Sequence, residues 1–315
     1  MARQQRRRTR YPVNGWLVLD KPLSMSSNDA LGQLKRIFHP EKVGHAGTLD
    51  PLASGCLPIA FGEATKTVPY VMDGRKVYRF EVTWGIQTNT DDAEGEVITT
   101  SDVRPNEKSI REVLPEFVGT IMQRPPAFSA IKIDGNRAYD LARGGELVEI
   151  EARPIEVHRL DLVSMPDENK AVFEAECGKG TYVRALARDL GERLGTCGYV
   201  TDLRRLLVGP FGEADMVTLD DLKEISEDYD GENPLEKPEL MDTILPVETA
   251  LYQLGSVVIT SDAAAKVKRG NAIILKGAGA PIGPEEIYVV AGGKLLAFGE
   301  VAQGKFQPKR VFNIS

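Results

Sequence analysis

Residues 75–86 of this 315-residue chain read RKVYRFEVTWGI, and the alternation of side chains in this stretch decides how the chain folds. One face would carry Val77, Arg79, Glu81 and Thr83, and the other Tyr78, Phe80, Val82 and Trp84. Successive side chains of a strand point to opposite faces of its sheet. The pattern therefore predicts a strand with one face on a hydrophobic core.

Further strands are expected on both sides of this one. They cover 15–20 (GWLVLD), 57–61, 155–163 and 171–177. The helical spacing of apolar residues predicts helices between Ser26 and Pro40, at 64–72, at 107–117 and from Thr181 onward. These elements follow no βαβ rhythm, so the expected class is α+β, with a mixed, largely antiparallel sheet flanked by helices.

The chain is expected to divide into a large and a small domain. Residues 1–10 would form a disordered basic tail, 11–246 the large domain, and 247–315 a small β-rich domain with glycines and short alternating runs. Within the large domain, residues 124–151 are a basic, proline-marked excursion with a short helix expected at 139–143. Residues 220–242 are expected to be an acidic linker or excursion.

The composition is that of a soluble globular protein, with 42% hydrophobic and 27% charged residues. No apolar run approaches the roughly 20 residues that cross a bilayer, and none follows the basic N-terminus, so we expect neither a membrane span nor a secretory signal. Cys56, Cys177 and Cys197 form no close pair, which indicates reduced thiols in the cytoplasm. The three scattered histidines lack the spacing of zinc ligands, so no metal site is expected.

The formal net charge of −7 is unevenly distributed along the chain. Residues 220–242 hold ten acids and two bases, a net charge of −8, which leaves +1 for the rest. Five of the first ten residues are arginines. Because nucleic-acid binding depends on local positive patches, the acidic average does not exclude RNA.

A second stretch, residues 44–55 (GHAGTLDPLASG), carries the candidate chemistry. Its glycines permit backbone angles that other residues avoid, and Pro51 pushes Asp50 toward an extended conformation. Such a loop would hold one carboxylate in a fixed place. Asp-Pro is also common turn chemistry, and on these residues alone a helix-capping turn is the favoured interpretation.

A third stretch, residues 178–184 (GKGTYVR), leads into a helix with an apolar stripe. The spacing leaves Arg184 and Arg188 together on a different face of that helix. On spacing alone, a solvated arginine face is the favoured interpretation.

These stretches belong to a set of segments that resembles the TruB-type tRNA pseudouridine synthases. The set comprises 15–28 (GWLVLDKPLSMSSN), 43–66 (VGHAGTLDPLASGCLPIAFGEATK), 76–80 (KVYRF), 178–184 (GKGTYVR) and 202–205 (DLRR). The resemblance covers 15–212, and the order and spacing of the motifs argue against chance agreement. It implies an isomerase that converts uridine 55 in the tRNA T-loop to pseudouridine by base flipping, alone and without a cofactor.

The resemblance also implies roles for individual residues. Asp50 would be the essential catalytic acid and Arg184 its partner. Tyr78 and Tyr182 would contact the flipped base with their rings, and Tyr78 completes the catalytic set. The strand pattern leaves a second interpretation of Tyr78 open, in which its ring belongs to the core.

Three further residues are implied in substrate binding. His45 would lie beside the extruded nucleotide. Lys21 would support the wall of the site and neutralise a phosphate, and Leu203 would contact the nucleotide through its backbone. Ordinary packing is an equally good interpretation of Leu203.

At the level of the whole chain, residues 124–151 match a family insertion that closes over RNA. More loosely, 247–315 resembles a PUA-like domain that extends the RNA surface, with Lys305, Lys309 and Arg310 close together. The expected partner is the T-arm stem-loop of tRNA, bound by a monomer without an obligatory protein partner. Two alternatives stay open: the catalytic subunit of a guide-RNA-dependent ribonucleoprotein, and a non-catalytic tRNA-folding factor.

Overall fold

The computed structural model describes residues 9–129, 132–133, 136–137, 150–227, 233–275 and 283–314. Residues 1–8 of the expected basic tail, and the helix expected at 139–143, lie outside the described residues. No helix in the described ranges is long and apolar enough to cross a membrane.

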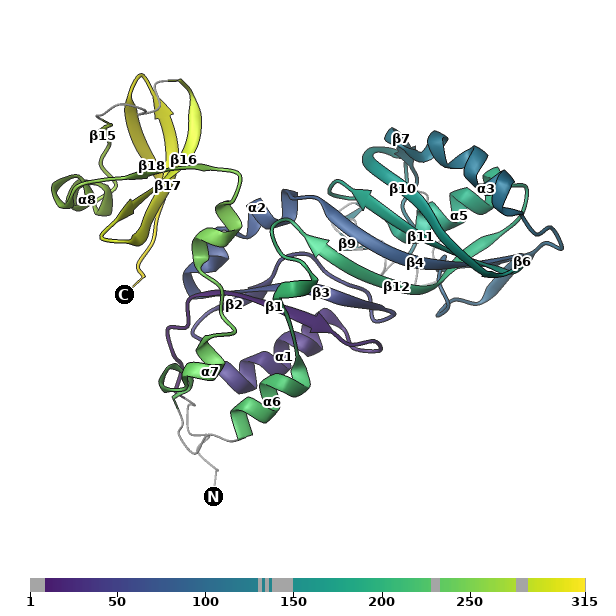
Figure 1. The fold of residues 1–315 in the computed structure, drawn as a ribbon, viewed down its shortest axis with the longest axis horizontal. Helices are drawn as coiled ribbons and strands as arrows, with labels where there is room; N and C mark the ends of the chain where they lie inside the picture. The colour runs from purple at the N-terminus through teal and green to yellow at the C-terminus, as the bar shows by residue number, and fades with distance from the viewer. Residues whose placement is uncertain are drawn as a thin grey trace.

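A nine-stranded mixed sheet forms the centre of the large domain (Figure 1). Its spatial order is β13-β1-β3-β12-β4-β11-β10-β7, with β2 paired to β3. The bounds are β1 Gly15–Lys21, β2 Val43–His45, β3 Ala53–Phe61, β4 Lys76–Trp84, β7 Gly119–Gln123, β10 Arg153–Asp167, β11 Lys170–Cys177, β12 Gly198–Val208 and β13 Met216–Thr218. The β1–β13 and β3–β12 pairs are parallel and the other neighbours antiparallel, which confirms the expected class.

Strand β4 confirms the prediction made for residues 75–86. Phe80, Val82 and Trp84 are buried, whereas Arg79 on the other face is exposed. The Phe80 ring stacks on Phe173 of β11, with 5.5 Å between ring centroids. The alternation therefore places one face of this central strand on the main core.

Strand β1 is apolar on both faces, because each face is covered. Leu17 and Leu19 join the main core beneath helix α1, while Trp16 and Val18 join a second core on the opposite face. A strand buried on both sides has no polar face, which explains the continuous run GWLVL.

Helices cover the sheet at both ends (Figure 1). The α-helices are α1 Ser27–Phe38, α2 Val68–Asp73, α3 Glu107–Val113, α5 Val183–Arg193, α6 Leu219–Glu227, α7 Pro238–Met241 and α8 Ser261–Lys268. The 3-10 helices are η1 Gly62–Lys66, η2 Leu114–Phe117, η3 Glu213–Asp215, η4 Pro234–Glu236 and η5 Val247–Leu251. Two short hairpins complete the fold before the small domain: β5 Ile86–Thr88 with β6 Val97–Thr100, and β8 Lys132–Ile133 with β9 Asn136–Arg137.

The acidic segment 220–242 differs from the expected linker or excursion. It contains most of α6 together with η4 and α7, and residues 228–232 lie outside the described residues. Leu222 and Leu240 are buried in the main core. Apolar residues spaced along the acidic stretch thus anchor it to the large domain, and the acids among its described residues are exposed.

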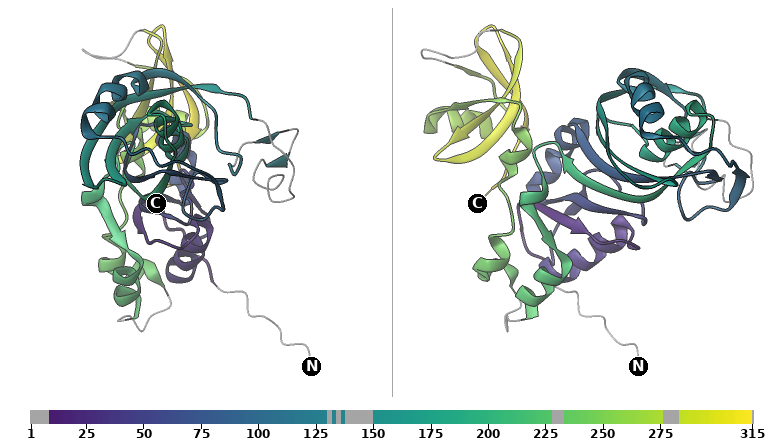
Figure 2. Two further views of the ribbon diagram at one scale, coloured as in Figure 1. Left: turned by 90° about the vertical axis from the view of Figure 1, so that its right-hand side faces the viewer. Right: turned by 45° about the vertical axis from the view of Figure 1, so that its right-hand side comes forward.

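A separate five-stranded sheet follows, as expected for the C-terminal part of the chain (Figure 2). Its order is β14-β16-β17-β18-β15, with bounds β14 Gly255–Val258, β15 Ile273–Ile274, β16 Glu285–Ala291, β17 Lys294–Ala302 and β18 Lys305–Val311. Phe298 and Phe312 pack into the second core. The Tyr70 hydroxyl donates to Glu286 at 2.7 Å, which ties this sheet to helix α2.

Helix α5 lies unusually close to strand β12. A Cβ atom added at Gly191 would meet the backbone nitrogen of Gly198 at 2.5 Å. The absence of a side chain at Gly191 therefore lets α5 approach the sheet. This approach matters because α5 carries Arg184 and Arg188.

We expect Gly191→Ala to lower the thermal unfolding midpoint, because overpacking of this kind costs about 1–3 kcal/mol. Gly32→Ala in α1 is the matched control, since a Cβ at Gly32 meets nothing within 4 Å. That change should raise the midpoint, because alanine stabilises a helix interior by about 0.5–1 kcal/mol relative to glycine. Equal midpoints for the two variants would contradict the close packing of α5 on β12.

Candidate active site

Asp50 lies in a loop whose backbone is fixed from one side by α1. The Ser27 hydroxyl donates to the Leu49 carbonyl at 2.9 Å and accepts from the Leu49 amide at 2.8 Å. The Ser24 amide donates to the Pro51 carbonyl at 2.9 Å. The loop leads directly into strand β3, so the helix-capping interpretation of Asp50 is wrong.

Arg205 holds the same loop from the other side. Its guanidinium donates to the carbonyls of Cys56 at 2.7 Å and Gly47 at 3.1 Å, and makes a longer contact with that of Thr48 at 3.5 Å. Arg205 is 2% exposed and forms no ion pair with a carboxylate of the described residues. We did not predict this role from the sequence, although Arg205 lies within the DLRR segment.

Gly55 makes room for this arrangement. Its φ is +94°, and a Cβ atom there would lie 2.3 Å from the Arg205 carbonyl oxygen. Only glycine satisfies both conditions without displacement of the backbone. The positive φ and the close Arg205 carbonyl oxygen explain why the third glycine of the loop motif, Gly55, is a glycine.

The guanidinium of Arg184 joins the Asp50 loop to two other segments. It lies 3.0 Å from Asp50 Oδ2 and 3.1 Å from Asp92 Oδ2. It also donates to the carbonyls of Thr90 at 2.9 Å and Phe128 at 3.0 Å. Arg184 is 7% exposed, so the solvated interpretation is wrong and the expected pairing with Asp50 is present.

Asp92 is the acid at this site that we missed from the sequence. Its carboxylate is buried and also accepts from the Thr90 hydroxyl at 2.6 Å and the Glu94 amide at 3.1 Å. The adjacent Asp91 pairs with Arg188 at 2.9 Å. The sequence holds a signal for this pairing. Asp91 and Asp92 are adjacent acids that follow a strand, and Arg184 and Arg188 lie four residues apart on one helix.

The Asp91–Arg188 pair is largely buried, as the Asp92–Arg184 pair is. Burial raises the pKa of the Asp91 carboxyl to about 6, although the nearby Arg188 and Arg184 charges oppose the rise. Arg188 additionally binds Asp189 at 2.7 Å and the Arg124 carbonyl at 2.7 Å. The second arginine of α5 therefore fixes the start of the segment 124–151.

Tyr78 lies on β4 with its ring packed against the main core. Burial raises the pKa of its hydroxyl, and the charge and hydrogen bond of Arg205 oppose that rise. The hydroxyl is consequently protonated at neutral pH. The core interpretation of this residue holds, and it is compatible with a hydroxyl end that faces the Asp50 loop.

Lys21 is fully buried beneath the loop. Its ammonium donates to the carbonyls of Pro22 at 2.9 Å and Met25 at 2.7 Å. Burial lowers its pKa to about 8, while the charge of Asp50 acts in the opposite direction. These contacts hold Lys21 in the wall of the site, and its expected neutralisation of a phosphate stays a prediction.

The remaining predicted residues lie around this centre. His45 ends β2, its Nδ1 atom is buried without a hydrogen-bond partner among the described residues, and burial lowers its pKa. Leu203 lies in β12 between β3 and β4, with its side chain in the main core. Tyr182 precedes α5, and its backbone exchanges two hydrogen bonds with the Gln123 side chain, at 2.9 and 3.1 Å.

In the part of the chain that the structure describes, no group of three or more histidine, cysteine, aspartate or glutamate side chains is placed to hold a metal ion. The candidate site therefore consists of one half-exposed carboxylate, Asp50, among buried cations and aromatic rings. Its side chain is 45% exposed, and its Oδ2 atom lies 3.0 Å from the Arg184 guanidinium. The exposed part of this carboxylate is accessible to a ligand.

Comparisons with known proteins show which proteins this chain resembles. Residues 35–183 match the family model described as "TruB family pseudouridylate synthase (N terminal domain)", and 184–252 match "tRNA pseudouridylate synthase B C-terminal domain". A tRNA pseudouridine synthase B of Bradyrhizobium diazoefficiens is 56% identical, over 100% of this chain and 91% of its own. That of Agrobacterium fabrum is 56% identical, over 98% of each chain.

Solved structures provide a second comparison. A chain of an "H/ACA RNP bound to a substrate RNA containing 2'-deoxyuridine" has a TM-score of 0.72 and 25% identity, over 95% of this chain and 85% of that one. A chain of a "Cbf5-Nop10-Gar1 Complex" has a TM-score of 0.71 and 27% identity, over 95% of this chain and 84% of that one.

We expect Asp92→Asn to lower the free energy of unfolding by about 1–3 kcal/mol, because it leaves the buried Arg184 with one carboxylate fewer. Asp161→Asn is the matched control, since Asp161 pairs with Arg159 at an exposed position. Its effect should stay within about 1 kcal/mol. Urea denaturation followed by tryptophan fluorescence gives both values, and equal effects would contradict the importance of the buried pair.

Proposed function

Because the chain belongs to the TruB family of pseudouridylate synthases, we propose that it isomerises uridine to pseudouridine at position 55, in the T-loop of tRNA. The observation that carries this proposal is the Asp50–Arg184 pair on a loop fixed from both sides. Such a loop offers one carboxylate oxygen to a substrate without changing shape. The relatives named above support tRNA as the RNA concerned.

The chemistry needs little beyond a well-placed carboxylate. The bond between N1 of uracil and C1′ of ribose breaks, the base rotates, and C5 becomes bonded to C1′. A proton leaves C5 and N1 gains one, so the reaction exchanges no electrons and transfers no group to a second molecule. Asp50 would act as a nucleophile or stabilise the positively charged ribose, and Arg184 would hold its other oxygen. We therefore propose a reaction without a cofactor.

The aromatic residues would serve the flipped base. An extruded base loses its neighbours, and stacking on an aromatic ring is worth about 1–3 kcal/mol per base. Tyr78 lies on β4, and Tyr182 directly precedes α5, the helix that carries Arg184. His45, kept neutral by its lowered pKa, would lie beside the extruded nucleotide, and the backbone of Leu203 would contact it.

The comparisons favour a stand-alone enzyme over a guide-RNA-dependent subunit. Identity is 56% to proteins named tRNA pseudouridine synthase B but 25–27% to chains from the H/ACA and Cbf5 complexes. We propose that the chain acts as a monomer on the T-arm stem-loop, without an obligatory protein partner.

The direct test uses the purified chain alone with unmodified tRNA. Pseudouridine is then mapped along the RNA by a chemical-adduct primer-extension assay. Product at uridine 55 is expected, from both full tRNA and the isolated T-arm stem-loop. The absence of product at that uridine would overturn the proposal.

We expect Asp50→Asn to reduce single-turnover pseudouridine formation by at least about 10³-fold. Its affinity for tRNA should stay within a few-fold of the original, because most contacts to RNA involve phosphates and sugars. The measurements are product formation at saturating tRNA and filter binding. This pair of results would also separate an enzyme from a non-catalytic tRNA-folding factor, for which Asp50→Asn changes nothing measurable.

The matched control is Asp73→Asn, which removes an exposed acid paired with Lys179 on the surface. It should leave both turnover and affinity unchanged. If Asp50→Asn lost tRNA binding together with activity while Asp73→Asn did not, Asp50 would be a structural residue of the RNA-binding surface instead.

A further inference from the structure

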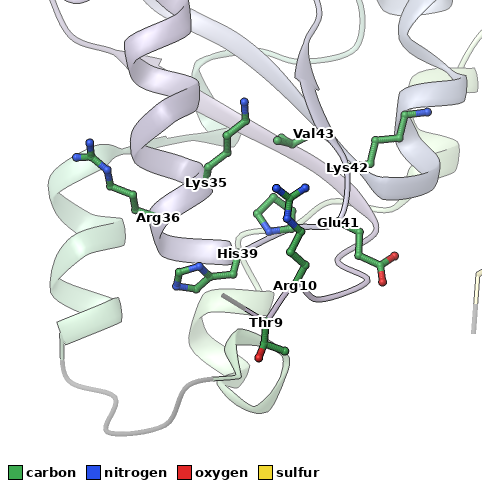
Figure 3. Close-up of a pocket in the computed structure, with 9 residues that line it drawn as sticks. Thr9, Arg10, Lys35, Arg36, His39, Glu41, Lys42 and Val43 are labelled. Carbon is green, nitrogen blue, oxygen red and sulfur yellow. The ribbon is translucent and has the colours of Figure 1, made fainter. Parts of the chain in front are cut away.

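A cavity of about 480 Å³ opens at the C-terminal end of α1 (Figure 3). Its walls come from the segment before β1, from the last turn of α1 and from the loop that enters β2. The charged or titratable residues that line it are Arg10, Lys35, Arg36, His39, Glu41 and Lys42. Four cations and one acid thus line a single concavity.

The positive charge of this cavity is not neutralised. Within the described ranges, Arg10, Lys35, Arg36 and Lys42 have no ion-pair partner, and all four are exposed. The arginines around the active site behave differently, since Arg184 binds two carboxylates. With Glu41 counted, the cavity carries a net charge of +3. A concave surface of one sign concentrates the field and attracts oppositely charged ligands.

The backbone holds the three walls together. His39 ends α1 in the left-handed conformation, at φ 41°. The Tyr11 amide donates to the His39 carbonyl at 2.8 Å, and the Glu41 amide donates to the Tyr11 carbonyl at 2.9 Å. Arg10 and Lys42 are therefore kept close to the helix end although they repel its lysine and arginine.

Helix stability explains only part of this cluster. Cations in the last turn of a helix interact favourably with its dipole, and this accounts for Lys35 and Arg36 without any ligand. It does not account for Arg10 and Lys42, which lie outside the helix and face the same cavity. The sequence adds Arg3, Arg6, Arg7 and Arg8 directly before Thr9. A polyanion is the ligand class that this charge pattern fits.

The position of the cavity connects it to the active site. Val43 lines the cavity and begins β2, the strand that ends at His45. Asp50 follows Val43 by seven residues, and seven residues span at most about 25 Å. A nucleic acid carries closely spaced charges, about one per 1.7 Å of duplex, so one RNA molecule can reach both places.

We propose that this cavity binds the phosphate backbone of the substrate RNA at a point remote from the target uridine, an inference that rests on the proposed function. The contact positions the RNA and carries no sequence information. It would raise affinity and leave the chemical step unchanged.

The test compares two triple variants in filter binding to unmodified tRNA between 50 and 200 mM salt. Lys35→Ala/Arg36→Ala/Lys42→Ala removes three cations of the cavity. Lys108→Ala/Arg111→Ala/Arg193→Ala is the control, which removes three exposed cations that pair with acids on the other side of the molecule. Lys35→Arg/Lys42→Arg keeps the charge of the cavity and should bind like the original chain.

Each phosphate contact contributes about 0.7–0.9 to the slope of log affinity against log salt. The cavity variant should therefore show a slope smaller by about two to three. Across that salt range the original chain would lose roughly 20- to 40-fold more affinity than the cavity variant. Single-turnover product formation at saturating tRNA should be the same for all variants.

Equal slopes and equal dissociation constants for the cavity variant and the control would overturn the inference. Circular dichroism checks that both variants are folded, and all substituted side chains are exposed. Binding and product formation are measured separately. If the original chain made no pseudouridine, but the variant that lacks Lys35, Arg36 and Lys42 still showed the smaller salt slope, the proposed function would be refuted and the cavity inference would stand.

Discussion

The buried guanidinium of Arg184 is the group on which the arrangement of the site depends. A buried charge is tolerated only when its hydrogen bonds are satisfied, and Arg184 finds its acceptors in three segments far apart in sequence. Those acceptors fix the Asp50 loop, the turn at Asp92 and the segment at Phe128 relative to α5. The carboxylate that faces the substrate is therefore positioned by the same group that holds the surrounding loops together.

Arg205 complements this arrangement from below the loop. Its N–H groups donate to backbone carbonyls and, among the described residues, not to a carboxylate. In that part of the chain, no negative charge is therefore paired with this buried guanidinium. The charge of Arg205 affects three neighbouring groups. It adds to the effect of burial in lowering the pKa values of His45 and Lys21, and it opposes the rise that burial causes in the pKa of Tyr78. Arg205 thus shapes the loop and adds its charge to the effect of burial on the groups around it.

Local patterns in the sequence predicted the elements well, because alternation and helical spacing reflect burial directly. The strand at Phe80 and the motif residues Asp50 and Arg184 were found in this way or through the family resemblance. Asp92 was missed, because its partner Arg184 lies 92 residues away and only the fold joins them. The acidic stretch was predicted to be a linker or excursion, because its charges hide the spacing of Leu222 and Leu240. Lys309, expected on an RNA surface, forms ion pairs with Glu286 and Glu300 that the sequence pattern did not predict.

The loop around Asp50 is held almost entirely through main-chain atoms, since Ser27 and Arg205 bind the backbone of Gly47 and Leu49. Backbone atoms are the same in every residue. Over evolutionary time, the exposed side chain of Thr48 can therefore be exchanged without loosening the loop. Gly55 has no such freedom, since any side chain there would collide with Arg205. Among descendants of this protein, many residue types should therefore occur at the position of Thr48, and only glycine at the position of Gly55.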